Sequence, residues 1–321
     1  MESLKEKRKK MSGVLALILG LLFCVLFSAA CSAEIVGPGT APGTDPAAEE
    51  PGPDPVILSP QASGTRTEEN EKAVIDYSHV EDGYVMVRYK GETDKRLKVQ
   101  VKNGDTTYVY NIKPGEWNVF PLSLGDGAYT VQCCENVEGN KYSVVLSARI
   151  DAKMTDEFAP FLRPNQYVDY AKAEGTLAQA SRLVRGKAAV LEKVGAVYDY
   201  VVKNLKYDYD LAKTVKSGYL PDLEQILTRK KGICFDYASL MTAMLRSQGV
   251  PCKLVVGYAG EAYHAWINVW CAEEGWLEKQ IYFDGKSWVR MDPTFASTMK
   301  SRSQAAKYVG DGSHYVEKFF Y

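Results

Sequence analysis

The chain has 321 residues, which is enough for one large domain or two ordinary ones. Hydrophobic residues make up 46% of it and charged residues 25%, a globular composition that excludes a wholly disordered chain. The 39 basic and 40 acidic residues nearly cancel, so the charge does not indicate a nucleic-acid partner and we expect none.

Residues 1–31 have the three parts of an export signal. A basic head is followed by an apolar run over residues 14–27 and by small residues that end at Cys31. The small residues before Cys31 resemble the lipobox of bacterial lipoproteins, although Ser28 stands where that family prefers leucine. We therefore expect lipidation of Cys31, with ordinary cleavage or a retained apolar anchor as the alternatives. All three place the remaining chain outside the cytoplasm, and lipid or anchor would hold it to a membrane.

Residues 32–72 are rich in proline, glycine, alanine, threonine and glutamate, as in the run GPGTAPGTDPAAEEPGPDP. Such a composition cannot bury enough apolar surface to offset the entropy that is lost when a chain becomes ordered. We expect a disordered, semi-extended tether that holds the folded part away from a membrane.

Residues 73–153 alternate short runs of β-branched and aromatic residues with turn signals such as Asn-Gly-Asp and Pro-Gly. About seven strands at this spacing predict an all-β, immunoglobulin-like sandwich. The region offers no catalytic pattern. His79 stands near a turn, where we expect an ordinary surface residue.

Residues 154–321 change first to helical periodicity and then to strands. Apolar residues recur three and four positions apart in four stretches, which cover residues 173–186, 187–208, 220–232 and 233–249. Short strand-like runs follow, namely CKLVVGYAG, AYHAWINVWC, KQIYFDG and SWVRMDP. Helices first and antiparallel strands afterwards predict an α+β domain.

Three residues in this second region have the chemistry of a thiol enzyme. Cys234 begins a predicted helix, where free backbone N–H groups and the positive end of the helix dipole favour a thiolate and can hold an oxyanion. His264 lies in a predicted strand, and Asp292 ends another one just before Pro293. A nucleophile, a base and an orienting carboxylate are the parts of nucleophilic catalysis. Each residue alone more often has a structural role, as a core thiol, a bonded histidine or a turn aspartate.

The local sequences GICFDYA, YHAWINVW and MDPTFA closely resemble the three motifs of the transglutaminase-like superfamily, over roughly residues 185–300. That family includes transglutaminases, peptide N-glycanase-type amidases and many bacterial proteins of unknown substrate. The resemblance implies a papain/transglutaminase-like core, with N-terminal helices, a catalytic helix and an antiparallel sheet. It implies that Cys234 is the nucleophile, His264 the base and then the acid, and Asp292 the group that orients the imidazole. No metal or other cofactor is expected.

A thiolate at this position would attack a carboxamide or peptide carbonyl, form a thioester and release ammonia or an amine. Water would complete hydrolysis, whereas a lysine amine would complete a cross-link, and the triad is the same for both outcomes. We expect a peptidase or amidase that acts on cell-surface protein or wall peptide. The alternatives are a true transglutaminase and a non-catalytic binding lipoprotein. Tyr207 is a candidate second oxyanion donor, and Asp236 is expected only to stabilise the start of the helix.

The runs CKLVVGYAG and AYHAWINVWC are close enough in sequence to form an antiparallel hairpin. If the turn centres between Glu261 and Ala262, Cys252 lies opposite Cys271. Outside the cytoplasm such a pair could be oxidised to a disulfide. A loop of three or four residues would instead shift the register by one and send the two side chains to different faces.

Overall fold

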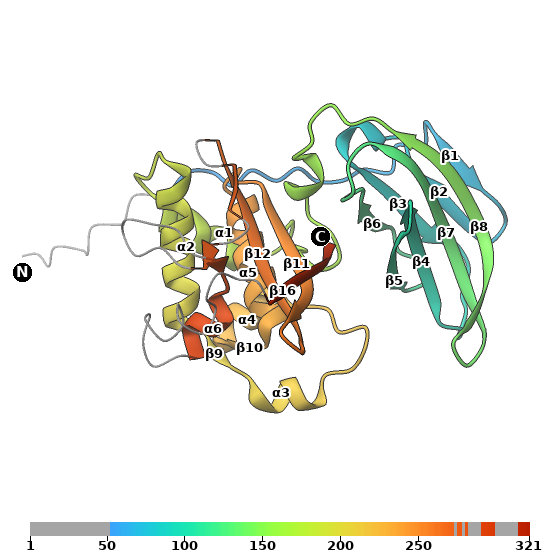
Figure 1. Cartoon of the computed structure of the whole chain (residues 1–321). Helices are drawn as coiled ribbons and strands as arrows, with labels where there is room; N and C mark the ends of the chain where they lie inside the picture. Colours follow the sequence, from blue (N-terminus) through green and yellow to red (C-terminus); the bar gives the residue numbers. More distant parts are fainter. Residues whose placement is uncertain (1–51, 273–274, 278–279, 282–289, 299–313) are drawn as a thin grey trace, which may run out of the picture. The chain divides into compact units, whose positions relative to one another are not determined.

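The computed structural model describes residues 52–272, 275–277, 280–281, 290–298 and 314–321 (Figure 1). The predicted signal peptide lies outside the described residues, and so does Cys31 with its expected lipid. The described residues belong to one compact unit, residues 50–321.

Two four-stranded antiparallel sheets come first along the described chain. The strand order is β1-β2-β3-β6 in one sheet and β5-β4-β7-β8 in the other. The strands of the first sheet are β1 (Thr67–Glu69), β2 (Ala73–Asp76), β3 (Tyr84–Tyr89) and β6 (Asn118–Pro121), with a 3-10 turn at Val80–Asp82. Those of the second are β4 (Leu97–Asn103), β5 (Thr106–Ile112), β7 (Gly127–Glu138) and β8 (Lys141–Ala152).

Alternation of side chains along the strands explains how the two sheets form a core. On β4, Val99 and Val101 are buried while Lys98 and Gln100 are partly exposed, as expected for a strand with one covered face. Buried residues of both sheets, among them Val85 and Val101, belong to one hydrophobic cluster. The region therefore consists of strands, while its immunoglobulin-like character stays a prediction.

The tether expected over residues 32–72 is wrong for its second half. The backbone N–H of Val56 donates to the Ser247 carbonyl at 2.8 Å, and that of Gln61 donates to the Tyr84 hydroxyl at 3.0 Å. Strand β1 then pairs with β2. The composition argument counts only the apolar side chains of the segment itself, whereas these contacts use its backbone groups against the folded part.

A buried helix, α5 (Cys234–Arg246), lies at the centre of the second region. Every residue of it from Asp236 to Arg246 is buried, because α1, α2, α4 and α6 pack against it from several sides. The described helices around it are α1 (Glu174–Val184), α2 (Val190–Asn204), α3 (Tyr209–Thr214), α4 (Leu223–Arg229) and α6 (Pro293–Thr298). A 3-10 turn at Ala159–Phe161 precedes them, and β9 (Lys206–Tyr207) pairs with β10 (Lys231–Gly232).

An antiparallel sheet covers α5, which packs against β11 and β12 (Figure 1). Its strand order is β13-β12-β11-β16, with β11 (Cys252–Ala259), β12 (Ala262–Cys271), β13 (Gly275–Leu277) and β16 (Tyr315–Phe320). A short parallel pair, β14 (Gln280–Ile281) and β15 (Arg290–Met291), forms a separate two-stranded sheet, and β15 contacts β12. Helices followed by an antiparallel sheet are found as predicted for β11 and β12, but the runs KQIYFDG and SWVRMDP contribute a parallel pair instead, and α6 follows it.

The predicted pairing of Cys252 with Cys271 is wrong. Cys252 lies opposite Val269 and keeps a free thiol, while Cys271 pairs with Gly275 on β13. The hairpin turns at Gly260-Glu261, one residue earlier than predicted, so the register moves by two. Gly260 has φ 62°, and glycine is favoured at the first central position of such a two-residue turn. A shift of two keeps each side chain on its predicted face but gives it a different partner.

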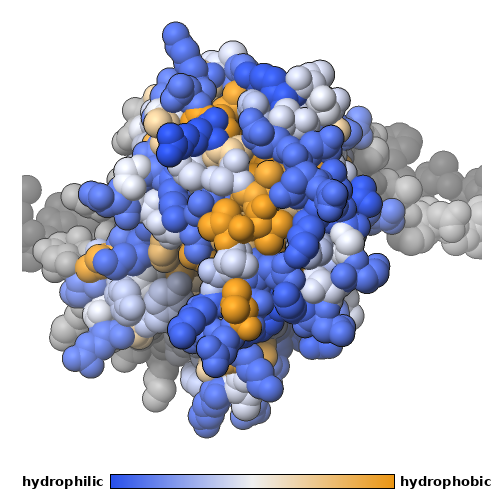
Figure 2. Space-filling model, turned by 90° about the vertical axis from the view of Figure 1, so that its right-hand side faces the viewer, coloured by the Kyte–Doolittle hydropathy of each residue, from blue (hydrophilic) through white to orange (hydrophobic). Residues whose placement is uncertain are grey.

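The face shown in Figure 2 is largely hydrophilic, with a small group of hydrophobic residues near its middle. The strongly exposed apolar side chains of β7 and β8 are Val137 and Val144. Within the described ranges, the helices are too short or too polar to cross a membrane.

Candidate functional site

The first residue of α5 is Cys234, and its neighbours explain why the helix begins there. The Asp236 carboxylate accepts a hydrogen bond from the backbone N–H of Ile233 at 2.8 Å, which caps the helix. A side chain at Gly232 would collide with this cap, because a Cβ there would lie 2.6 Å from the Asp236 Cβ. Cys234 therefore stands where the free N–H groups of the first turn and the positive end of the helix dipole are concentrated.

Asp236 does more than stabilise the start of α5. Its second oxygen accepts a hydrogen bond from the Tyr219 hydroxyl at 2.8 Å, and the residue is only 1% exposed. Burial raises the pKa of Asp236, although the hydrogen bonds from Ile233 and Tyr219 oppose that shift. Asp236 thus connects the segment between α3 and α4 to the helix that carries Cys234.

His264 and Asp292 form a buried pair. The His264 Nε2 lies 2.6 Å from the Asp292 Oδ2, and the two residues are 7% and 0% exposed. The same carboxylate oxygen accepts from the Tyr315 hydroxyl at 3.0 Å, and the other oxygen accepts from the Thr294 N–H at 3.1 Å. These hydrogen bonds hold the Asp292 carboxylate in place, and it fixes one edge of the imidazole ring in turn.

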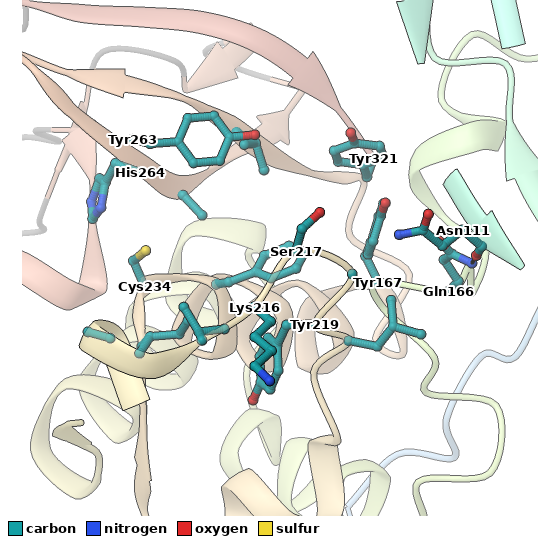
Figure 3. Close-up of a pocket in the computed structure, with 18 of the residues that line it drawn as sticks. Asn111, Gln166, Tyr167, Lys216, Ser217, Tyr219, Cys234, Tyr263, His264 and Tyr321 are labelled. Atoms are coloured by element: carbon teal, nitrogen blue, oxygen red, sulfur yellow. Dashed lines mark hydrogen bonds between the residues drawn. The ribbon is translucent and has the colours of Figure 1, made fainter. Parts of the chain in front are cut away.

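The other edge of the ring faces the thiol. Because Asp292 holds Nε2, Nδ1 is the nitrogen left for Cys234, and the two side chains are hydrogen-bonded. Figure 3 shows the two side chains beside each other at one end of the cavity. Burial is the largest influence on the pKa of His264 and lowers it, but Asp292 and Cys234 together outweigh burial and raise it from 6.5 to about 10. Near neutral pH the ring is therefore protonated between two acidic partners.

A cavity of about 500 Å³ opens beside this pair. Cys234 and His264 lie at one end of it, and Asn111 and Gln166 lie at the other (Figure 3). The volume is typical of a ligand pocket, and Cys234 is not fully buried, so a substrate carbonyl could reach the sulfur. The structure thus brings all three predicted residues together at the edge of a cavity.

The model of the transglutaminase-like superfamily core matches residues 177–293. This part of the chain belongs to the transglutaminase-like superfamily. The matched residues run from α1 to the first residue of α6 and include Cys234, His264 and Asp292. The resemblance that the three sequence motifs indicated is confirmed.

The relatives match only part of this chain. YebA of Bacillus subtilis, an uncharacterized protein, is 28% identical over 118 residues, which cover 30% of this chain and 16% of YebA. The protein-glutamine gamma-glutamyltransferase of Pseudomonas aeruginosa is 34% identical over 62 residues, which cover 15% of this chain and 9% of that protein. The chain therefore spans less than a fifth of the length of either relative.

Among solved structures, the periplasmic domain of TgpA from Pseudomonas aeruginosa, bound to ethylmercury, is similar to this chain at 18% identity. The match covers 74% of this chain and 78% of that one, with a TM-score of 0.33. A score at this level does not establish a shared fold.

Of two tyrosines beside the transglutaminase-like site, the sequence analysis named one and missed the other. Tyr207, on β9, lines the cavity, and burial followed by the nearby Cys234 raises its pKa, so its hydroxyl stays protonated near neutral pH. The sequence named Tyr207 as a candidate oxyanion donor. Tyr315 was missed, because no local pattern marks it and only the pairing of β16 with β11 brings it to Asp292.

His79 has a similar set of partners outside the transglutaminase-like domain. Its Nε2 lies 2.5 Å from the Ser63 Oγ, and its Nδ1 lies 3.1 Å from the Asp82 Oδ2. Ser63 is exposed, the Asp82 carboxylate also binds Arg163 at 3.0 Å, and neither Ser63 nor His79 lines the cavity. His79 is thus bonded on both sides, although the sequence predicted an ordinary surface residue. The cavity and the helix N-terminus distinguish the site at Cys234.

Proposed function

We propose that this chain is an extracytoplasmic thiol enzyme that acts on amide or peptide carbonyls through Cys234, His264 and Asp292. One observation carries the proposal. His264 is buried between the Asp292 carboxylate at 2.6 Å and the thiol of Cys234, at the N-terminus of α5 and at the edge of a cavity. An intact arrangement of this kind argues against a purely binding lipoprotein.

The first half of the reaction follows from this geometry. The Cys234 sulfur attacks the carbonyl carbon while His264 keeps its proton, and the oxyanion that forms is held by the N–H groups of the first turn of α5. The Tyr207 hydroxyl is the candidate second donor. His264 Nδ1 then gives its proton to the nitrogen of the leaving amine, the C–N bond breaks, and a thioester remains on Cys234.

The second half returns the enzyme to its starting state. The now neutral His264 takes a proton from water, the resulting hydroxide attacks the thioester, and the sulfur leaves as thiolate. Asp292 keeps the Nε2 of His264 facing it throughout, so that Nδ1 always serves the reacting groups. Hydrolysis of a peptide or carboxamide on cell-surface protein or wall peptide is the outcome that we propose.

Transamidation is the second candidate. It uses the same thioester but releases it to a lysine amine, and one relative is a protein-glutamine gamma-glutamyltransferase. That relative shares only a short segment with this chain. The triad alone does not separate the two outcomes, because only the acceptor differs.

We also propose that the chain is exported, carries a lipid on Cys31 and contains an immunoglobulin-like sandwich. The basic and apolar pattern of residues 1–31 supports export and a lipid on Cys31 as the membrane partner. The strand orders β2-β3-β6 and β5-β4-β7-β8 support an immunoglobulin-like sandwich. The Tyr129 hydroxyl donates to the Gly125 carbonyl at 2.9 Å near the start of β7, as the tyrosine corner of such sandwiches does.

The test uses casein, which contains both glutamine side chains and peptide bonds. The purified chain is incubated with casein with and without a tagged primary amine, and the products are analysed by mass spectrometry. Hydrolysis predicts cleavage or deamidation in both samples, and transamidation predicts attachment of the tag. Cys234→Ala should abolish either product while Cys252→Ala, which removes a free thiol on β11, should not. Product formation by Cys234→Ala would refute the proposal.

A further inference from the structure

The transglutaminase-like domain does not build the cavity alone. Val109 and Asn111 of β5 line it together with Lys113, which follows β5, and Gln166 and Tyr167 line it from the segment before α1. On β5, Tyr108 and Tyr110 are buried, whereas Val109 and Asn111 point to the other face of the strand and are exposed. The exposed face of a sandwich edge strand is therefore one wall of the cavity.

Contacts of β5 with the C-terminal residues and with Gln166 hold this wall in place. The Tyr108 hydroxyl accepts a hydrogen bond from the Phe320 N–H at 3.2 Å, and the rings of Tyr108 and Tyr321 meet edge to face at 5.6 Å. Gln166 donates to the Asn111 carbonyl at 3.1 Å. Because β16 and β5 are joined by such contacts, the wall keeps its position relative to the sheet that carries His264.

A loop of the transglutaminase-like domain meets the sandwich at this end. At Gly218, φ is +90° and a Cβ would lie 2.9 Å from the Asn111 Nδ2, so the loop backbone passes close to the carboxamide. Lys216 and Ser217, which precede Gly218, also line the cavity. Tyr219, the next residue, donates to Asp236 at the start of α5. We call Asn111, Lys113, Gln166 and residues 216–218 the far end of the cavity.

The far end is rich in positive charge and hydrogen-bond donors. The charged residues that line the described cavity are Lys113, Lys216 and the protonated His264, and no aspartate or glutamate lines it. Across the described part of the chain, no ion pair is formed by Lys113 or by Lys216. The carboxamides of Asn111 and Gln166 add N–H donors. Such a set matches a carboxylate, which accepts several hydrogen bonds and gains from nearby cations.

We infer that the sandwich is the specificity half of the active site, and that the far end binds a carboxylate on the acyl part of a peptide substrate. The inference rests on the proposed function and names its substrate class. The lysine ammonium of a cross-linking acceptor would be repelled by the cations that line this cavity, and no carboxylate lines it to pair with that ammonium. Hydrolysis is therefore favoured over cross-linking. The sandwich is then a part of the catalytic unit and not a spacer.

Binding tests the inference separately from turnover. Two fluorescent tetrapeptide amides, identical except for glutamate or glutamine on the acyl side, are titrated into Cys234→Ala protein. We expect about tenfold tighter binding of the glutamate peptide, in line with the worth of a charge-assisted hydrogen bond. Lys113→Gln combined with Lys216→Gln should remove the preference. Lys141→Gln, at the exposed first residue of β8, is the control and should keep it.

Turnover of the same peptides by the unmodified chain separates the two proposals. Equal binding of both peptides, or a preference unchanged in the Lys113 and Lys216 double variant, overturns the inference even if both peptides are hydrolysed. A glutamate preference in binding without any turnover supports the site and refutes the proposed reaction. Tighter binding of the glutamine peptide overturns the inference as well.

Discussion

Two histidines, one in each region of the molecule, have almost the same hydrogen-bond partners. His264 stands between a carboxylate and a thiol, and His79 stands between a carboxylate and a hydroxyl. Their surroundings differ. His264 is 7% exposed, lies at the edge of a cavity and serves a sulfur at a helix N-terminus, whereas the Ser63 hydroxyl beside His79 is exposed. Hydrogen-bond pattern alone does not make a catalytic group, because burial, an oxyanion site and room for a substrate are needed too.

Replacing Cys234 or Ser63 should give the largest difference in the rate of peptide hydrolysis. Cys234→Ala is expected to lower peptide hydrolysis by about four orders of magnitude or more, because the covalent route is lost. Ser63→Ala should leave the rate unchanged. Steady-state turnover of a validated peptide measures both. A loss of activity in Ser63→Ala would show instead that His79 takes part in the reaction.

Replacing the carboxylates of Asp292 and Asp82 should give a smaller difference in turnover. Asp292→Asn is expected to lower turnover by about two to four orders of magnitude, because the amide no longer keeps His264 in the required tautomer. Asp82→Asn, the matched change beside His79, should have no effect on the rate. If Asp292→Asn remains fully active while its circular dichroism matches that of the parent, Asp292 is only a helix-start residue.

Tyr315 should have a more modest effect. Tyr315→Phe removes one of the hydrogen bonds that fix Asp292 and should lower kcat about tenfold, in line with the worth of a hydrogen bond to a charged group. The Tyr84→Phe variant, which loses a hydroxyl next to His79, serves as the control. An unchanged kcat in Tyr315→Phe would show that the other partners of Asp292 suffice.

The smallest expected effect is on stability and its dependence on pH. The pKa of His264 is raised from 6.5 to about 10 in the folded chain, so the folded state binds its proton more tightly than the unfolded state. The stabilisation is therefore complete below pH 6.5 and is lost as the pH rises toward 10. Urea unfolding should show the difference between the parent and His264→Gln shrinking across that window. A difference that grows with pH would mean that the ring is neutral in the folded state.

The three site residues could be proposed from the sequence because their motifs are local. A cysteine after Gly232, the His-Ala-Trp run at His264 and the Asp-Pro-Thr run at Asp292 each depend on a few neighbours, and the structure brings these residues together. Helices followed by antiparallel strands were predictable from apolar periodicity for the same reason.

What the sequence did not predict depends on contacts between distant segments. The Tyr315 contact with Asp292 needs β16 beside β11, and the position of Asn111 in the cavity needs β5 beside the C-terminal strand. The predicted hairpin register was wrong because the turn was placed one residue too late. A shift of one residue in the turn changes the partner of each residue by two positions. Residues 52–72 were assigned to a tether because composition does not reveal backbone partners elsewhere.

If His264 activates the Cys234 thiol as proposed, alkylation of the native protein measures that activation. Cys133, Cys134, Cys252 and Cys271 are buried, and burial raises the pKa of both Cys133 and Cys252 to about 12. With iodoacetamide at neutral pH, Cys234 should react faster than any of these four, and His264→Ala should slow it about tenfold or more while leaving the others unchanged. Peptide mapping by mass spectrometry gives each rate. An equal rate at Cys234 with and without His264 would show that His264 does not activate the thiol.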